Sequence, residues 1–595
     1  MEFLARSTLT LSGSGTHKLA RWAIAMAALA IGPTYARAQT SADACPRPSP
    51  GSAVPEPADI HSQSGLLKIT FSFRRSAQPD GSVRYCYIAQ DGSESPTLRV
   101  QPGDEVIFTL KNEIPADNAA AQEPAHLHTI PGACAGGGAM SASATNLHFH
   151  GLAIPALCHQ DEVLTTSVLP ASPPYEYRFK IPADQPPGLY WYHPHLHGFT
   201  KAQVLGGASG ALIVEGLERF EPALAGIPER VLVIRDQDLL HPNAAPNPGA
   251  AAAPVVIDKD GDALNTGDGT GMPAKDISVN FVPVPYPNYE PAILRMKPKE
   301  RQLWRVLNAS AITYVNLQIV FNGAIQWMAV VGLDGVPLGY SGQAGHKVSW
   351  QTHVGIPPGG RAEFVFAAPS QGAATFETKS VDTGTGGEND PIRPIANIVI
   401  SPDAPEPQAK LAISPQPMPR PSLPWLGDVA PARTRKLYFS ETLQDPDDPN
   451  SPTTFFITVD GQTPTVFDPQ NMLPNITVHQ GDVEDWIIEN RSRELHAFHI
   501  HQLHFLLLER FGAPAREPFL RDTLNIPFWD GKTSEYPSVK VRMDFRGPDI
   551  VGVFPYHCHL LEHEDGGMMG VLRVEPAERA SANSSDPRSG ASPSQ

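Results

Sequence analysis

Apolar and polar residues alternate along several short stretches of this chain. In "LKITFSF" (67–73) every second residue is apolar, as in a strand with one buried face. The 62 prolines and 49 glycines of the 595-residue chain interrupt it too often for long helices. The pattern therefore predicts an all-β fold of antiparallel sandwiches, each of roughly 150 to 200 residues.

Three segments of the chain align without gaps: "VQPGDEVIFTLKN" (100–112), "MKPKERQLWRVLN" (296–308) and "VHQGDVEDWIIEN" (478–490). Each has an acidic residue at its fifth position, an aromatic residue at its ninth and a closing asparagine. Because the segments lie far apart, they predict three similar units rather than a solenoid.

Composition sets the expected limits of these units. Proline-rich tracts and changes in composition predict a flexible lead (39–63), a first unit (64–216), a second unit (227–401), a proline-rich linker (402–430), a third unit (431–576) and a disordered tail (577–595).

The first 38 residues have the pattern of a secretory signal peptide. Lys18 and Arg21 precede the apolar run 22–31, and a small-x-small cleavage site ends at Ala38. No other segment is apolar over the length of a membrane-spanning helix, so we expect no membrane insertion of the mature chain. The protein is therefore expected to be periplasmic or secreted.

Charge and cysteine content limit the possible partners and disulfide bonds of the protein. A net charge of −17 disfavours nucleic acid as a partner. Export permits disulfides, but Cys45, Cys86, Cys134 and Cys158 can pair in three ways that sequence does not separate. The pair Cys134 and Cys158 is favoured because these residues bracket a histidine motif. The fifth cysteine, Cys558, has different surroundings.

Histidines recur in pairs separated by one residue. Residues i and i+2 of a strand point to the same face, so each pair presents two imidazoles together, and imidazole suits copper, zinc and iron. The six pairs are His126/His128, His148/His150, His193/His195, His195/His197, His499/His501 and His557/His559.

Cys558 lies between two of these histidines in "YHCHLLEHEDGGMMG" (556–570). On a strand, its side chain would point away from those of His557 and His559 and so belong to a different metal centre. Two imidazoles, one thiolate and one thioether form the ligand set of a blue-copper site. Such a set is offered by His496, Cys558, His563 and Met568.

Four segments resemble the copper motifs of the multicopper oxidases, the family that includes the laccases: "HFHG" (148–151), "WYHPHLHG" (191–198), "HAFHIHQLHF" (496–505) and "HCHLLEHEDGGMM" (557–569). The resemblance extends from residue 64 to 576. It implies three cupredoxin-like Greek-key β-sandwich domains and four coppers per chain.

The resemblance also implies which residue holds which copper. The type 1 ligands are His496, Cys558, His563 and axial Met568; the type 2 ligands are His148 and His499; the type 3 ligands are His150, His193 and His559 for one copper and His195, His501 and His557 for the other. All of them fall in the first and third units, which implies a trinuclear cluster between these units and leaves the second unit as a spacer.

A copper-dependent oxidoreductase follows from the resemblance. Its type 1 copper would take single electrons from phenols or aromatic amines, as in a laccase, and its cluster would reduce dioxygen to water. A metal-ion oxidase for cuprous, ferrous or manganous ions is the alternative, which the acidic surface favours. A copper-free structural protein of the cell envelope with the same fold is a further alternative, against which the complete ligand set argues. A copper store or chaperone is another, but it would not need two centres joined through one cysteine.

Reduction of dioxygen to water consumes protons, so the family pattern raises the question of their source. Glu564 follows His563 directly, and similar oxidases have an acid there beside the oxygen-reducing site. Asp161 is the second expected proton donor, with Glu162 as its substitute. The family usually has proline and glycine where Ala497 and Gln502 stand, which is expected to alter the loop that faces the substrate.

Overall fold

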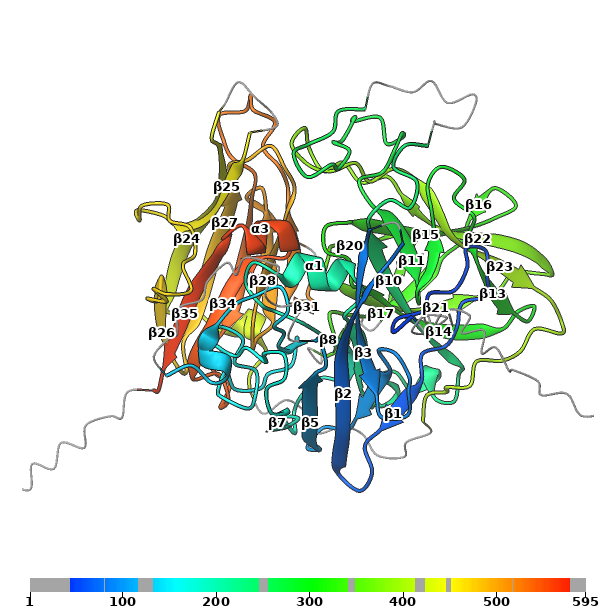
Figure 1. Ribbon diagram of the computed structural model, residues 1–595, viewed down its shortest axis with the longest axis horizontal. Coiled ribbons are helices and arrows are strands. Elements are labelled where there is room, and N and C mark those ends of the chain that lie inside the picture. Colours follow the sequence, from blue (N-terminus) through cyan, green and yellow to red (C-terminus); the bar gives the residue numbers. More distant parts are fainter. Residues whose placement is uncertain are drawn as a thin grey trace, which may run out of the picture. The chain divides into compact units, whose positions relative to one another are not determined.

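The computed structural model describes residues 43–79, 81–115, 132–244, 255–340, 348–412, 423–445, 451–515 and 517–577. These residues are mainly strands, which form six sheets (Figure 1). Within the described ranges, we find no helix with the length and apolar character needed to cross a membrane. The predicted signal peptide and all but the first residue of the predicted tail lie outside these ranges.

The first two sheets are built from residues 59–214. One has the strand order β1-β4-β9-β8-β6 and the other β3-β2-β5-β7. The four apolar residues of "LKITFSF" are buried on β2, as the alternation predicts. The strands are β1 (Asp59–His61), β2 (Leu66–Ala77), β3 (Val83–Ala89), β4 (Thr97–Val100), β5 (Glu105–Asn112), β6 (His148–His150), β7 (Tyr175–Lys180), β8 (Gly188–His193) and β9 (Gly210–Val214).

Residues 229–400 form the second pair of sheets, with the central orders β12-β11-β10-β14-β21-β17-β18 and β13-β23-β22-β15-β16. The strands are β10 (Glu229–Gln237), β11 (Asp276–Val279), β12 (Val282–Val284), β13 (Ala292–Met296), β14 (Arg301–Asn308), β15 (Val315–Phe321), β16 (Ala324–Ile325), β17 (Met328–Leu333), β18 (Val336–Pro337), β19 (Ser349–Gln351), β20 (Val354–Ile356), β21 (Arg361–Ala367), β22 (Gly372–Lys379) and β23 (Arg393–Ile400).

Residues 433–575 form the third pair, with the central order β25-β24-β27-β33-β29-β30 in one sheet and β26-β35-β34-β28-β32 in the other. The strands are β24 (Arg433–Leu443), β25 (Thr453–Val459), β26 (Ile476–His479), β27 (Val483–Asn490), β28 (His496–Ile500), β29 (Phe505–Arg510), β30 (Ala513–Pro514), β31 (Leu520–Arg521), β32 (Thr523–Ile526), β33 (Ser538–Asp544), β34 (Gly552–Cys558) and β35 (Met569–Glu575).

The helices are short. Two of them, α1 and α3, lie side by side and join the first pair of sheets to the third (Figure 1). The Asp565 carboxylate accepts the backbone N–H groups of Thr200 and Lys201. The α-helices are α1 (Thr200–Leu205), α2 (Leu217–Phe220) and α3 (Leu561–Asp565), and the 3-10 helices are η2 (Gly136–Gly138), η3 (Pro222–Leu224) and η4 (Leu426–Asp428).

The three aligned segments occupy equivalent places in the three pairs of sheets. Their second strands, β5, β14 and β27, each run parallel to the first long strand of their unit, which is β2, β10 or β24. The acidic residue at the fifth position accepts a backbone N–H three residues earlier in every copy. The closing asparagine donates to two backbone carbonyls in every copy. The repeat therefore preserves the residues that fix each turn.

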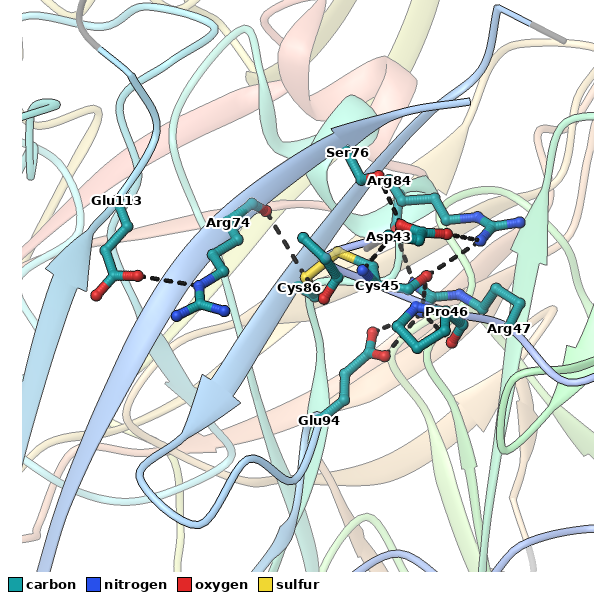
Figure 2. Close-up of a disulfide and its surroundings, with 12 residues drawn as sticks. Asp43, Cys45, Pro46, Arg47, Arg74, Ser76, Arg84, Cys86, Glu94 and Glu113 are labelled. Atoms are coloured by element: carbon teal, nitrogen blue, oxygen red, sulfur yellow. Dashed lines mark hydrogen bonds and ion pairs between the residues drawn. A yellow bond between two sulfur atoms is a disulfide. The ribbon is translucent and has the colours of Figure 1, made fainter. Parts of the chain in front are cut away.

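The flexible lead predicted for residues 39–63 is wrong for its described part, 43–63. A disulfide joins Cys45 to Cys86 on β3 (Figure 2), and β1 pairs in parallel with β4. The proline-rich composition of this segment resembles a linker, but the covalent bond and the strand pairing anchor it to the first unit. The favoured pair Cys134 and Cys158 also forms a disulfide.

Candidate metal centres

Strand β34 supplies histidine and cysteine side chains to two separate clusters. Its pairing with β28 places Cys558 opposite Phe498 and His557 opposite His499. The Nε2 atom of His557 lies 3.3 Å from Nε2 of His501. The Cys558 sulfur points to the other face, 3.6 Å from Nδ1 of His496. Neighbouring residues of one strand therefore reach two different groups of imidazoles, as the alternation predicts.

The larger cluster contains eight buried histidines contributed by the first and third pairs of sheets. Three imidazoles that converge from different strands are His195, His501 and His557, and other converging sets include His148, His150 and His193. The cluster consists of His148 and His150 on β6, His193 and His195 at the end of β8, His499 and His501 at the end of β28, and His557 and His559 at the end of β34.

The smaller cluster lies within the third pair of sheets. His496, Cys558 and His563 have their donor atoms within 4.8 Å of one another. The Met568 side chain is fully buried, and its backbone N–H donates to the carbonyl of His563 while its carbonyl accepts from the N–H of Cys558. All four residues expected at a type 1 copper thus lie in one neighbourhood.

The imidazoles of the larger cluster have nitrogens free for a metal ion. Nε2 of His148, His193 and His499, and Nδ1 of His150, are buried without any hydrogen-bond partner. Unpaired buried polar atoms are costly, and a bound ion removes that cost. Burial also lowers the pKa of His557 to about 3, so its imidazole is neutral and able to bind a metal. These donors fit copper.

The second nitrogen of several ligand candidates is held by the protein. Nδ1 of His148 contacts the Asp161 carboxylate at 2.9 Å, and Nδ1 of His499 contacts the backbone carbonyl of Asp522 at 2.8 Å. Such contacts fix the ring orientation and the tautomer, so that Nε2 is presented to the metal.

Asp161 contacts three groups, a geometry that favours an orienting role over the proton delivery expected from sequence. Besides the contact with His148, it accepts the Phe149 backbone N–H at 2.9 Å and the Gln502 side-chain amide at 2.7 Å. Glu162, its expected substitute, is bonded to the Thr166 hydroxyl within its own loop.

Gln502 stands where the family usually has glycine, and it keeps a left-handed backbone with φ of 62°. Its amide reaches the buried Asp161 and therefore supports the metal cluster. The sequence prediction had assigned this difference to the substrate-facing loop instead.

Glu564 lies beside the larger cluster, as expected from sequence. Its Oε2 is 3.2 Å from Nδ1 of His557 and its Oε1 is 3.6 Å from Nε2 of His195. The carboxyl group is fully buried, and neither oxygen has a hydrogen-bond partner. Burial, reinforced by the neighbouring Asp565, raises the pKa of Glu564 well above its usual value.

The second unit does more than separate the other two. Arg361, at the start of β21, is buried and forms a two-pronged ion pair with Asp522 of the third unit, at 2.7 and 2.6 Å. Asp522 in turn lies 3.3 Å from Nε2 of His150. The prediction that the second unit is only a spacer is therefore incomplete. No sequence motif identifies this ion pair, because Arg361 and Asp522 lie 161 residues apart.

Carboxylates also contact the smaller cluster. Oε1 of Glu441 lies 3.1 Å from Nε2 of His496, and Oε1 of Glu494 lies 3.2 Å from Nε2 of His563. Glu494 is buried, and its neighbour Glu388 is buried too. None of these three glutamates was predicted from the sequence, because each lies outside the histidine motifs.

Known proteins match this chain over much of its length. Family profiles described as multicopper oxidase match residues 140–219 and 441–578. The multicopper oxidase mco of Staphylococcus aureus is 23% identical over 488 residues, which cover 80% of this chain and 81% of that protein.

Two solved structures have a similar fold. A multicopper oxidase from Campylobacter jejuni, described as a metallo-oxidase, is 22% identical with a TM-score of 0.58, covering 89% of this chain and 96% of its own. A laccase from Pediococcus acidilactici is 20% identical with a TM-score of 0.58, covering 89% and 94%. With buried imidazoles that fit copper and matches to both histidine-rich regions, this protein belongs to the multicopper oxidase family and is a copper-dependent oxidoreductase.

Proposed function

We propose that the protein couples one-electron oxidation of a reducing substrate to the four-electron reduction of dioxygen to water. Four coppers would supply this redox chemistry when bound. His496, Cys558, His563 and Met568 would hold the type 1 copper. The cluster would take His148 and His499 for the type 2 copper, with the remaining six histidines shared between two type 3 coppers.

The observation that carries this proposal is the placement of residues 557–559. Cys558 faces the smaller cluster, while His557 and His559 face the larger one. A few covalent bonds therefore connect the two centres, which a copper store would not need. Purified holoprotein tests the proposal: we expect four coppers per chain, a blue colour and oxygen uptake with a phenol. A colourless protein without oxygen uptake would refute it.

Glu564 is proposed to deliver protons near the cluster, because its carboxyl group lies between His195 and His557. Replacement by glutamine keeps the shape and removes the acid. We expect Glu564→Gln to slow reoxidation of the fully reduced enzyme by oxygen about 10²-fold in stopped-flow experiments, the lower range for loss of a general acid.

Anaerobic reduction of the blue copper should be unchanged in the same variant. The matched control is Glu162→Gln, which alters a carboxylate bonded to Thr166 in its own loop. Reoxidation of Glu564→Gln at the wild-type rate, or equal slowing in the control, would contradict the proposed proton delivery.

Phenols and aromatic amines are the first proposed substrate class, in line with the resemblance to laccases. Metal ions are the second, and the buried carboxylates beside the smaller cluster favour them. Glu494 contacts His563, and burial together with the nearby Glu494 raises the pKa of Glu388 well above its usual value. Carboxylate oxygens suit manganous and ferrous ions better than soft cuprous ions.

Replacement of Glu494 separates these two substrate classes. We expect Glu494→Gln to lower kcat/KM for ferrous ions about tenfold or more, because an amide replaces the carboxyl group that would bind the cation on losing its proton. The same value for a phenol should change far less, since a neutral donor needs no carboxylate. The control is Glu509→Gln, a more exposed acid of the same unit. A parallel fall for both substrates would exclude a cation-specific role.

Export is also proposed, and the signal-like N-terminus and two disulfides support it. Mass spectrometry of protein from the native host would test it, since the mature chain is expected to begin at Gln39. An intact N-terminus in a cytoplasmic fraction would contradict export.

A further inference from the structure

A cavity of about 960 Å³ lies apart from both histidine clusters, bounded by elements of all three units. Strands β2 and β3 and helix α1 contribute one side, β10 and β11 a second, and α3 with β25 a third. Its volume is in the range of small-molecule sites, roughly 300 to 1,000 Å³. The cavity is therefore large enough for an organic ligand.

Arg235 on β10 lines this cavity, and the Glu94 carboxylate that interacts with its charge is paired directly with Arg47 instead. Its side chain is buried at 3% exposure, and its hydrogen bonds go to the hydroxyl and the carbonyl of Ser209. In the part of the chain that the structure describes, no carboxylate forms an ion pair with it. Burial, reinforced by the nearby Arg47, lowers the pKa of Arg235 to about 9, so the group is still charged at neutral pH. A buried, unpaired cation is unfavourable.

Arg47 adds a second guanidinium group beside Arg235. The guanidinium carbons of Arg47 and Arg235 lie 4.2 and 4.0 Å from the centre of the Phe281 ring. Glu94 is bonded to Arg47 at 2.7 Å, so its charge is already engaged (Figure 2). The disulfide between Cys45 and Cys86 fixes the segment that carries Arg47. This wall of the cavity is thus rigid and positively charged.

The other charges of the cavity have partners. Glu562 is paired with Lys201 and Lys259, and Asp238 with Lys275. Asp43 holds Arg84, as Figure 2 shows. The exception besides Arg235 is Arg75, whose Nε is buried without a partner. Arg235, which uses Nε and Nη2 on Ser209, therefore keeps further N–H donors for an anion.

We propose that this cavity binds an organic anion. Its carboxylate or phosphate group would accept hydrogen bonds from the guanidinium N–H groups of Arg235. The planar fork of arginine matches both oxyanions, and charge-assisted hydrogen bonds of this kind are strong. The site is separate from the copper ligands, and its occupant would lie against α3, the helix that carries His563.

Calorimetry on the copper-loaded protein at low ionic strength tests the proposal with citrate, AMP and inorganic phosphate. We expect citrate or AMP to bind once per chain with a Kd below about 1 mM, and inorganic phosphate to bind more weakly because it fills little of the cavity. The stronger organic probe identifies the oxyanion as carboxylate or phosphate. Failure of both organic probes to bind, or equal affinity for inorganic phosphate, would overturn the proposal.

Variants locate the binding site. Arg235→Gln should weaken binding about tenfold or more, the usual effect of losing a charge-assisted hydrogen bond. The control Arg178→Gln changes an exposed arginine outside the cavity and should bind as the wild type does. If Arg235→Gln fails to fold, Ala202→Trp fills the cavity from the exposed face of α1 while Arg235 stays unchanged in sequence, and it should weaken binding equally. Unchanged binding in either folded variant would contradict the proposed site.

Discussion

Cys558→Ser is expected to abolish both the intense blue absorption and the oxidase activity while leaving a type 2 copper in place. Cys558 is the one free cysteine of the structure that we describe, and its sulfur lies 3.6 and 3.8 Å from Nδ1 of His496 and His563. A serine hydroxyl is a far weaker ligand for copper than a thiolate, so the type 1 site loses its colour and its route for electrons.

The larger cluster should survive this change. His148 and His499 keep their contacts with Asp161 and with the carbonyl of Asp522, so the type 2 signal in electron paramagnetic resonance is expected to remain. The double variant Cys134→Ser/Cys158→Ser is the control, because it also removes sulfur but leaves the copper ligands untouched. A Cys558→Ser protein that stays blue would rule out the type 1 assignment.

The position of the histidine clusters could be predicted from sequence because their spacing is local. A one-residue separation on a strand fixes which side chains share a face, and that rule alone assigns His557 and Cys558 to different clusters. The threefold repeat was predictable for the same reason. Residues such as Asp104, which accepts the backbone N–H of Gln101, act on backbone groups of the turn they belong to, so their role is visible in a short window of sequence.

The groups around the clusters could not be predicted, because they depend on tertiary contacts. Glu441 and Glu494 reach the imidazoles of the smaller cluster from outside the motifs, and Gln502 reaches Asp161 across 341 residues. The lead before residue 64 was predicted wrongly for a related reason. Its composition favours a loop, whereas a disulfide with Cys86, which sequence could not assign, holds it in place.

Asp522 is expected to control both the stability of the fold and the copper content of the cluster. The carboxylate pairs with the buried Arg361 and lies 3.3 Å from Nε2 of His150. Asp522→Asn keeps the backbone carbonyl that accepts from His499, but it leaves the guanidinium buried without an anion. Breaking a buried pair in this way costs about 3 to 5 kcal/mol.

The second expected effect of Asp522→Asn is on metal binding. His150 presents Nδ1 to the cluster when Nε2–H has an acceptor, and the charged acceptor is the Asp522 carboxylate, with the Thr523 hydroxyl at 3.4 Å as a neutral partner. Asparagine removes that charge and so weakens the contact. Loss of such a contact typically lowers metal affinity about 10- to 100-fold. We therefore expect a lower unfolding midpoint in urea and less copper per chain, with the blue band retained because the type 1 ligands are untouched.

Restoring the balance of charge separates the two effects. The double variant Arg361→Met/Asp522→Leu removes both members of the buried pair and leaves only Asp334, 3.9 Å from the guanidinium group, without its cation, so part of the lost stability should return. Copper content of the cluster should stay low, since His150 still has no carboxylate to orient it. Recovery of copper together with stability would mean that Asp522 acts on the cluster only through the fold. A single Asp522→Asn variant with full copper and a wild-type oxygen reaction would contradict both roles, and the contribution of the second unit to the cluster would then be limited to packing.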